Sequence, residues 1–142
     1  MMRIDEKGRK LIQGFEGLRL KAYRCPANIP TIGWGHTANV RMGDEITRDE
    51  AEDLFTQDIA KFENCVHKYA TVELSQNEFN ALVSLAYNIG CNALKRSTLL
   101  KRLNVNRKED AADEMLRWDN AGGRKLAGLT RRRNEEREMF LS

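Results

Sequence analysis

The strongest restriction on the fold comes from one long helical pattern that follows Thr47. Thr47 and Glu50 are spaced so that each side chain can accept from the other's backbone N–H group, which forms a capping box. Beyond this box, apolar residues recur at helical spacing as far as about Tyr69; they are Ala51, Leu54, Phe55, Ile59, Phe62 and Val66. A helix of about 22 residues is roughly 33 Å long, which is enough to join two lobes.

Other helix starts are predicted by side chains that can accept from the free N–H groups of a first turn. The predicted caps are Asp5, Ser75 with Glu78, Ser97 before Thr98–Leu103, Asn106 with Glu109, and Thr130. The helix after Ser75 is apolar on most faces and stops at Gly90, so it should be central to a helical lobe. Gly122 and Gly123 are expected to break the chain before the last helix.

A small β-hairpin is predicted between the first helix and the long one. Residues 18–22 alternate apolar and polar, as in a half-buried strand, residues 26–28 form a turn, and residues 29–34 form a second strand. A third short strand with a loop is expected within residues 38–46. These elements predict a mostly helical α+β domain spanning 1–142. It comprises a small lobe (about 14–46), a bridging helix (about 47–69), a helical lobe (about 70–142, packed with helix 5–14) and a cleft between the lobes.

Composition fits one domain and sets limits on its partners. The chain has 142 residues, a net charge of +3 and 41% hydrophobic residues, enough to bury a core. No apolar run reaches the roughly 18 residues of a membrane span, and the first residues lack the apolar segment of a secretory signal. We therefore expect no stable membrane insertion, and a monomer is the simplest expectation.

The three cysteines are predicted to be free thiols, because their number is odd and their spacing is wide and irregular. Cys65 and Cys91 are interpreted as small buried apolar residues. No Cys-x-x-Cys pair is present, and Cys65 and His67 would point apart on a helix, so zinc is not expected. No other metal and no cofactor is predicted.

The chemistry is predicted to lie within residues 14–37. Glu16 stands where the helical pattern gives way to the strand pattern, next to Phe15 and Leu18. Apolar neighbours disfavour the charged form of a carboxyl group and raise its pKa, which is how a general acid is made at neutral pH. The hairpin would let Glu16, Cys25 and Thr31 face one cleft.

This stretch resembles the active-site signature of the phage-type lysozymes, or endolysins, of glycoside hydrolase family 24. That family carries Glu, eight residues, usually Asp, five residues and Thr, followed by a Gly-aromatic-Gly-His-Thr run. Glu16, position 25 and Thr31 have this spacing, and residues 33–37 follow it as GWGHT. Residues 79–90 also resemble the family's core helix. The departure is Cys25, which stands where the family usually has Asp.

The resemblance implies hydrolysis of the β-1,4 bond between N-acetylmuramic acid and N-acetylglucosamine in bacterial peptidoglycan. Glu16 would protonate the leaving oxygen, and Thr31 would orient water or substrate. A net positive enzyme also suits an anionic wall, since steering raises encounter rates. The protein would be made in the cytoplasm of the host cell, reach the periplasmic wall through a holin or a similar route, and lyse the cell.

Cys25 leaves three hypotheses open. An ordinary thiol is only slightly ionised at neutral pH, so Cys25 should be a poorer base for water than Asp. A thiolate is, however, a good nucleophile, so Cys25 could attack the anomeric carbon and give retention. The thiol could instead only position water. In the third hypothesis the site has lost turnover and merely binds peptidoglycan, or was altered deliberately to trap substrate.

The resemblance assigns supporting roles to further residues. His36 could be a metal ligand or a base, but an ion pair is favoured, and the resemblance names Asp58 as its partner. Trp34 and Trp118 are expected to pack rather than to form sugar platforms, although Trp34 could do both. The resemblance implies that arginine in the run Arg131, Arg132 and Arg133 lies near the cleft, so one of the three could steady the catalytic carboxylate.

Two other functions compete with the enzyme. One is a silent peptidoglycan-binding module, and the other is a small basic nucleic-acid binder that uses Arg131, Arg132 and Arg133. Glu135, Glu136 and Glu138 follow at once and no aromatic residues are interleaved, so a solvated face with i,i+4 pairs is favoured over a nucleic-acid site.

Overall fold

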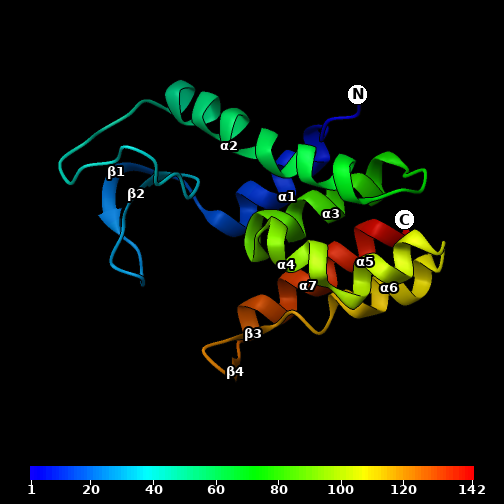
Figure 1. Ribbon diagram of the computed structural model, residues 1–142. Helices are drawn as coiled ribbons and strands as arrows, with labels where there is room; N and C mark the ends of the chain where they lie inside the picture. The colour runs from blue at the N-terminus through cyan, green and yellow to red at the C-terminus, as the bar shows by residue number, and fades with distance from the viewer. The chain divides into compact units, whose positions relative to one another are not determined.

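Most of the chain is helical, and the long helix forms where the sequence predicts it. The structure, a computed structural model, describes all 142 residues. Its helices are α1 (Glu6–Glu16), α2 (Arg48–Tyr69), α3 (Gln76–Ile89), α4 (Cys91–Arg96), α5 (Thr98–Asn104), α6 (Lys108–Met115) and α7 (Ala127–Leu141). Its strands are β1 (Arg19–Arg24), β2 (Pro30–Gly33), β3 (Asn120–Ala121) and β4 (Arg124–Lys125). Figure 1 shows these elements along the chain. The predicted mostly helical α+β class is confirmed.

The capping boxes before the two longer predicted helices are present. At the start of α2, the Thr47 N–H donates to Glu50 Oε1 over 3.0 Å, and the Glu50 N–H donates to Thr47 Oγ1 over 3.1 Å. Ser75 and Glu78 make the same pair of bonds at the start of α3. Ser97 caps α5, and Asp5 accepts from the Gly8 N–H at the start of α1. Four helix starts therefore follow from local capping chemistry.

Two predicted caps are wrong. Asn106 does not cap α6; its φ of 62° is left-handed, and its N–H donates to Leu103 O as the chain leaves α5. Asparagine tolerates this conformation better than most residues, so Asn106 ends α5 and does not begin α6. Thr130 lies inside α7, which begins at Ala127, and its hydroxyl is 3.0 Å from Asp119 Oδ2.

The chain folds into two compact units, each described here by itself. The hairpin unit comprises Lys10–Lys61, and the helical unit comprises Met1–Arg9 with Phe62–Ser142. Helices α1 and α2 each contribute residues to both units. No helix of the chain is both long enough and apolar enough to span a bilayer.

In the hairpin unit, β1 and β2 pair antiparallel, with Tyr23 opposite Thr31 and an irregularity between Arg19 and Tyr23. The prediction of a half-buried first strand is wrong: β1 is mostly exposed, and Leu20 is 40% exposed. The buried side chains come from α1, from β2 and the turn after it, and from α2: Ile12, Ile32, Trp34, Ala51, Phe55 and Ile59. The predicted third strand is also wrong, because residues 38–46 contribute only one isolated bridge, between Lys21 and Glu45.

The helical unit is built around α3, as its all-round apolar character predicts. Residues 79–86 are all buried, and α3 packs against α7 and α4, while α6 packs against α5 and α7. The N-terminal segment is held on this unit by side chains of α2 and α3: the Ile4 N–H donates to Glu63 Oε2 over 2.8 Å, and Asn80 Nδ2 donates to Asp5 Oδ1 over 2.7 Å.

Cys65 and Cys91 form a disulfide, which corrects the prediction of free thiols. Cys65 lies near the end of α2 and Cys91 begins α4, and their Cα atoms are 6.0 Å apart. The two cysteines are 26 residues apart in the sequence, so their spacing does not reveal that they are close in space. They meet because α3, which lies between them in the chain, brings Cys91 back to the end of α2. Cys25 is the free cysteine of the chain.

Candidate active site

Glu16 lies at the junction that the sequence predicts. It is the last residue of α1 and is half-buried, as are Phe15 and Leu18. Gly17 then adopts a φ of 73°, and its N–H donates to Gln13 O over 3.0 Å, which ends the helix. The carboxyl group is thus carried on a regular helix end, three residues before β1 begins.

Cys25 and Thr31 lie together at the closed end of the hairpin. The Cys25 N–H donates to Ile29 O over 3.0 Å, and Asn28, in the left-handed region with φ 63°, donates its N–H to Cys25 O over 2.7 Å. Thr31 is buried, and its hydroxyl lies 2.8 Å from Ile29 O. The turn at residues 26–28 therefore brings Cys25 and Thr31 to the same end of the hairpin, where each bonds to Ile29 O.

The surroundings of Cys25 favour its thiolate. The Ile29 N–H is the main cause and lowers the pKa of the Cys25 thiol; partial burial opposes it, and the Ala27 N–H and the Thr31 hydroxyl lower the pKa further. Hydrogen bonds donated to sulfur stabilise the charged form more than the neutral one. Cys25 is therefore ionised to a greater extent at neutral pH than an ordinary cysteine.

His36 makes the predicted contact with Asp58 on α2. Its Nδ1 lies 2.8 Å from Asp58 Oδ2, and its Nε2 lies 2.9 Å from Ala38 O. Gly33 and Gly35, with φ values of 67° and 88°, allow the tight loop in which Ile32 and His36 exchange both backbone hydrogen bonds. This loop aims the imidazole at α2.

Trp34 is a packing residue of the hairpin unit. It is 4% exposed, its ring meets Phe55 edge-on with centroids 5.9 Å apart, and the Arg48 guanidinium lies 5.7 Å from its ring centroid. A ring buried in this way stabilises the unit and leaves little of its face for a sugar.

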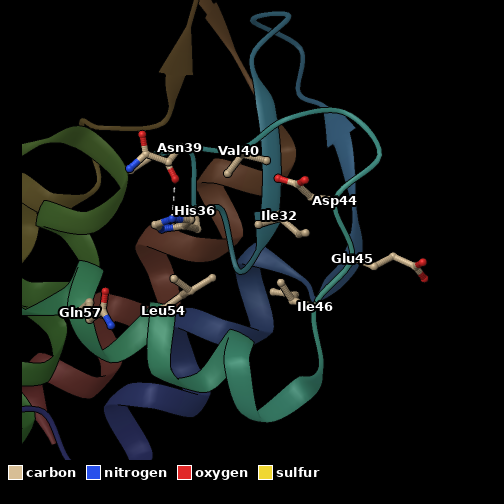
Figure 2. A pocket seen from close by; sticks show the side chains of 10 residues that line it. Ile32, His36, Asn39, Val40, Asp44, Glu45, Ile46, Leu54 and Gln57 are labelled. Atoms are coloured by element: carbon tan, nitrogen blue, oxygen red, sulfur yellow. Dashed lines mark hydrogen bonds between the residues drawn. The ribbon is translucent and has the colours of Figure 1, made fainter.

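A pocket of about 440 Å³ lies beside His36 within the hairpin unit (Figure 2). Ile32, Ile46 and Leu54 give it apolar walls, while Asn39, Asp44 and Gln57 give polar ones. Its charged groups are already used: Asp44 Oδ2 accepts from the Arg41 N–H over 2.9 Å, and Glu45, which points away from the other labelled side chains, pairs with Lys21 at 3.8 Å. The pocket therefore offers a ligand few unpaired polar groups.

The arginine run is not the solvated face that the sequence predicts. Arg131 is exposed, but Arg132 and Arg133 are buried in the helical unit around Glu136, which is itself 0% exposed. Arg132 Nε lies 3.2 Å from Glu136 Oε2, and Arg133 also pairs with Glu136. The buried position lowers the pKa of Arg133, which Glu136 opposes. Two of the three arginines are thus unavailable to a nucleic acid, so the run does not form the basic surface patch that a nucleic-acid binder would need.

The comparisons with known proteins identify the family. Residues 13–136 match the family model described as Phage lysozyme, and this range includes Glu16, Cys25 and Thr31. The chain belongs to the phage lysozyme family. It is accordingly a lysozyme-type glycosidase.

Relatives of the same length agree with this placement. An endolysin of Acyrthosiphon pisum secondary endosymbiont phage 1 is 44% identical over 145 residues, covering 99% of both chains. The endolysin of Salmonella phage P22 is 40% identical and covers 100% of both. The muramidase domain of SpmX from Asticaccaulis excentricus has a TM-score of 0.94 and 37% identity, covering 100% of this chain and 99% of that one.

The six site residues predicted before position 60 all belong to the hairpin unit, whereas Arg131 and Arg132 belong to the helical unit. The sequence missed the β3–β4 hairpin and the hollow that it borders, which is lined by Lys125, Ala127, Thr130, Arg131 and Asn134. A signal was present: Gly122 and Gly123 stand between short polar segments, a common mark of a tight hairpin.

Proposed function

We propose that this lysozyme hydrolyses the β-1,4 bond between N-acetylmuramic acid and N-acetylglucosamine, with Glu16 as general acid. The observation that carries the proposal is the paired placement of Cys25 and Thr31 at the closed end of the hairpin, with Ile29 contacting both. A phage lysozyme family match that includes the whole Glu16 to Thr31 spacing supports it.

In the proposed first step, the Cys25 thiolate attacks the anomeric carbon while the bond to the leaving oxygen breaks. Glu16 gives its proton to that oxygen, which leaves as a sugar hydroxyl. In the second step, water attacks the anomeric carbon, the C–S bond breaks to regenerate thiolate, and the Glu16 carboxylate takes the water's proton. The lowered pKa of Cys25 favours this version over one in which a neutral thiol only positions water.

The other predicted residues have supporting roles in this proposal. The Thr31 hydroxyl donates to Ile29 O and, after the Ile29 and Ala27 backbone, helps to lower the pKa of Cys25. Trp34 and the His36–Asp58 pair hold the loop after β2 against α2. Arg132 is engaged by Glu136 and Ser84, so it acts by positioning, and Arg131 is left to contact substrate.

The biological setting is also proposed. Several relatives are named endolysins, and we propose that this chain likewise degrades the bacterial wall during host lysis. It would act as a two-lobed monomer bridged by residues 47–69. It would be made in the host cytoplasm and reach the wall through a holin or a similar route.

The products and the Cys25→Ala variant test the mechanism. Digests of purified peptidoglycan should gain muramic acid at their new reducing ends, detectable after borohydride reduction. The first-formed anomer should show retention, and Cys25→Ala should lose most turnover. New ends of N-acetylglucosamine would contradict the bond assignment. Inversion, or full activity in Cys25→Ala, would contradict the nucleophile and leave Glu16 as the acid.

A further inference from the structure

An open hollow in the helical unit is bordered by two basic side chains, Lys125 and Arg131. Its volume is about 530 Å³, within the usual range of small-ligand sites of roughly 300–1,000 Å³. Ala127, Thr130, Arg131 and Asn134 line it from one face of α7, at i, i+3, i+4 and i+7, and Lys125 borders it from β4. One helix face and one hairpin strand thus build a single hollow.

The two cations of the hollow differ in how they are held. Lys125 Nζ lies 3.6 Å from Asp119 Oδ2, and Asp119 is buried and also accepts from the Thr130 hydroxyl. Asp119 therefore holds Thr130 at the rim and pairs loosely with the exposed Lys125. Arg131 is exposed and has no ion-pair or hydrogen-bond partner within the chain.

The balance of charge favours an anionic ligand. Lys125 and Arg131 bring two positive charges, while Asp119 supplies one negative charge. The exposed guanidinium offers several N–H donors in a planar fork that matches a carboxylate. Asn134 keeps its side chain in place by donating Nδ2 to Thr130 O over 2.8 Å.

We propose that this hollow is a subsite for a carboxylate of the peptidoglycan stem peptide, with Arg131 as the main contact and Lys125 as the second. The inference rests on the proposed function, which makes peptidoglycan the substrate. The acetylated sugars of the glycan strand carry no charge, so the free carboxylates of the stem peptides are the anions that the polymer offers. The small side chain of Ala127 leaves the room that the ligand occupies.

Binding to insoluble peptidoglycan tests the subsite without requiring turnover. All chains would carry Glu16→Gln so that the polymer stays intact, and peptidoglycan would first be stripped of phosphate polymers with hydrofluoric acid. Affinity is measured by cosedimentation with this polymer and with the same polymer after its carboxylates have been converted to amides.

The parent chain should bind the amidated polymer about fivefold more weakly, the size of effect expected of one exposed ion pair. Arg131→Gln should lose the same factor on the untreated polymer and nothing further on the amidated one. Ala127→Leu, which fills the hollow without changing charge, should behave like Arg131→Gln. Lys101→Gln removes an exposed charge from α5 and should match the parent on both polymers.

Equal losses for Arg131→Gln on both polymers would overturn the subsite, because the arginine would then act without the carboxylates. A loss that appears only before hydrofluoric acid treatment would also overturn it and would indicate phosphate polymers as the ligand. Sugar ends released by the chain without Glu16→Gln are counted separately, so a failure of hydrolysis is distinguished from a failure of the subsite.

Discussion

The hydrogen bonds around Cys25 predict a thiol that reacts at lower pH than an ordinary cysteine. Since the thiolate is the reactive form, alkylation should accelerate as pH rises through the pKa, and the folded chain should reach its plateau at lower pH than the urea-unfolded chain. Cys65 and Cys91 are joined, so without reductant the rate reports Cys25.

Thr31→Val should raise the pKa of Cys25, because the Thr31 hydroxyl is among the groups that lower it. The alkylation rate at neutral pH should fall, while the plateau rate at high pH should not change. Thr56→Val is the control, since that hydroxyl bonds to Glu52 O within its own helix. The same pH profile in Thr31→Val and the parent would contradict the role given to the hydroxyl.

The His36–Asp58 contact predicts a loss of stability that exceeds any loss of turnover. Asp58→Asn removes the charge from a partly buried hydrogen bond and should lower the free energy of unfolding by about 1–2 kcal/mol, with turnover within about twofold. Urea unfolding and initial rates measure the two effects. Asp53→Asn, an exposed change on α2, should alter neither. A large fall in turnover at unchanged stability would assign the pair to catalysis instead.

Among the elements, the link between α2 and α4 should depend on redox conditions. Reducing the Cys65–Cys91 disulfide should lower the free energy of unfolding by about 3 kcal/mol, because it closes a loop with a separation of 26 residues. Urea unfolding with and without reductant measures the change. The Cys65→Ser/Cys91→Ser double variant should already have the lower stability and should not respond to reductant. A parent chain indifferent to reductant would contradict the bond's contribution.

Helix α7 should depend on the buried ion pairs at Glu136. Glu136→Ala leaves the guanidinium groups of Arg132 and Arg133 buried without their carboxylate, which should cost about 3 kcal/mol of stability. Glu135→Ala changes an exposed neighbour on the same helix and should cost less than about 0.5 kcal/mol. Equal midpoints of thermal unfolding for the two variants would contradict this account of α7.

Elements that depend on local chemistry could be predicted from the sequence, whereas those that depend on distant contacts could not. The boxes at Thr47 and Ser75 need only residues within one helical turn. Asn106 has the same spacing but lies in a left-handed conformation that the end of α5 requires. The pairing of Cys65 with Cys91 needs the path of α3, which no local pattern encodes.

For the whole molecule, the sequence could place the candidate residues that lie close together in the chain, at the end of α1 and in the hairpin after it. Glu16, Cys25 and Thr31 lie within 16 residues of chain, so their spacing can be recognised directly in the sequence. The burial of Arg132 and the hollow at Arg131 depend on how α7 meets α3 and the β3–β4 hairpin. Charge patterning alone could not separate one exposed arginine from two buried ones.

The central claim is that Glu16 supplies the proton for cleavage, and one comparison tests it most directly. Release of reducing ends from purified peptidoglycan is measured at neutral pH for the parent chain and for Glu16→Gln, with equal thermal midpoints verified first. The account predicts activity in the parent and a loss of at least about 100-fold in the variant, the usual contribution of general acid catalysis. Equal rates for the two chains, or an inert parent, would contradict it.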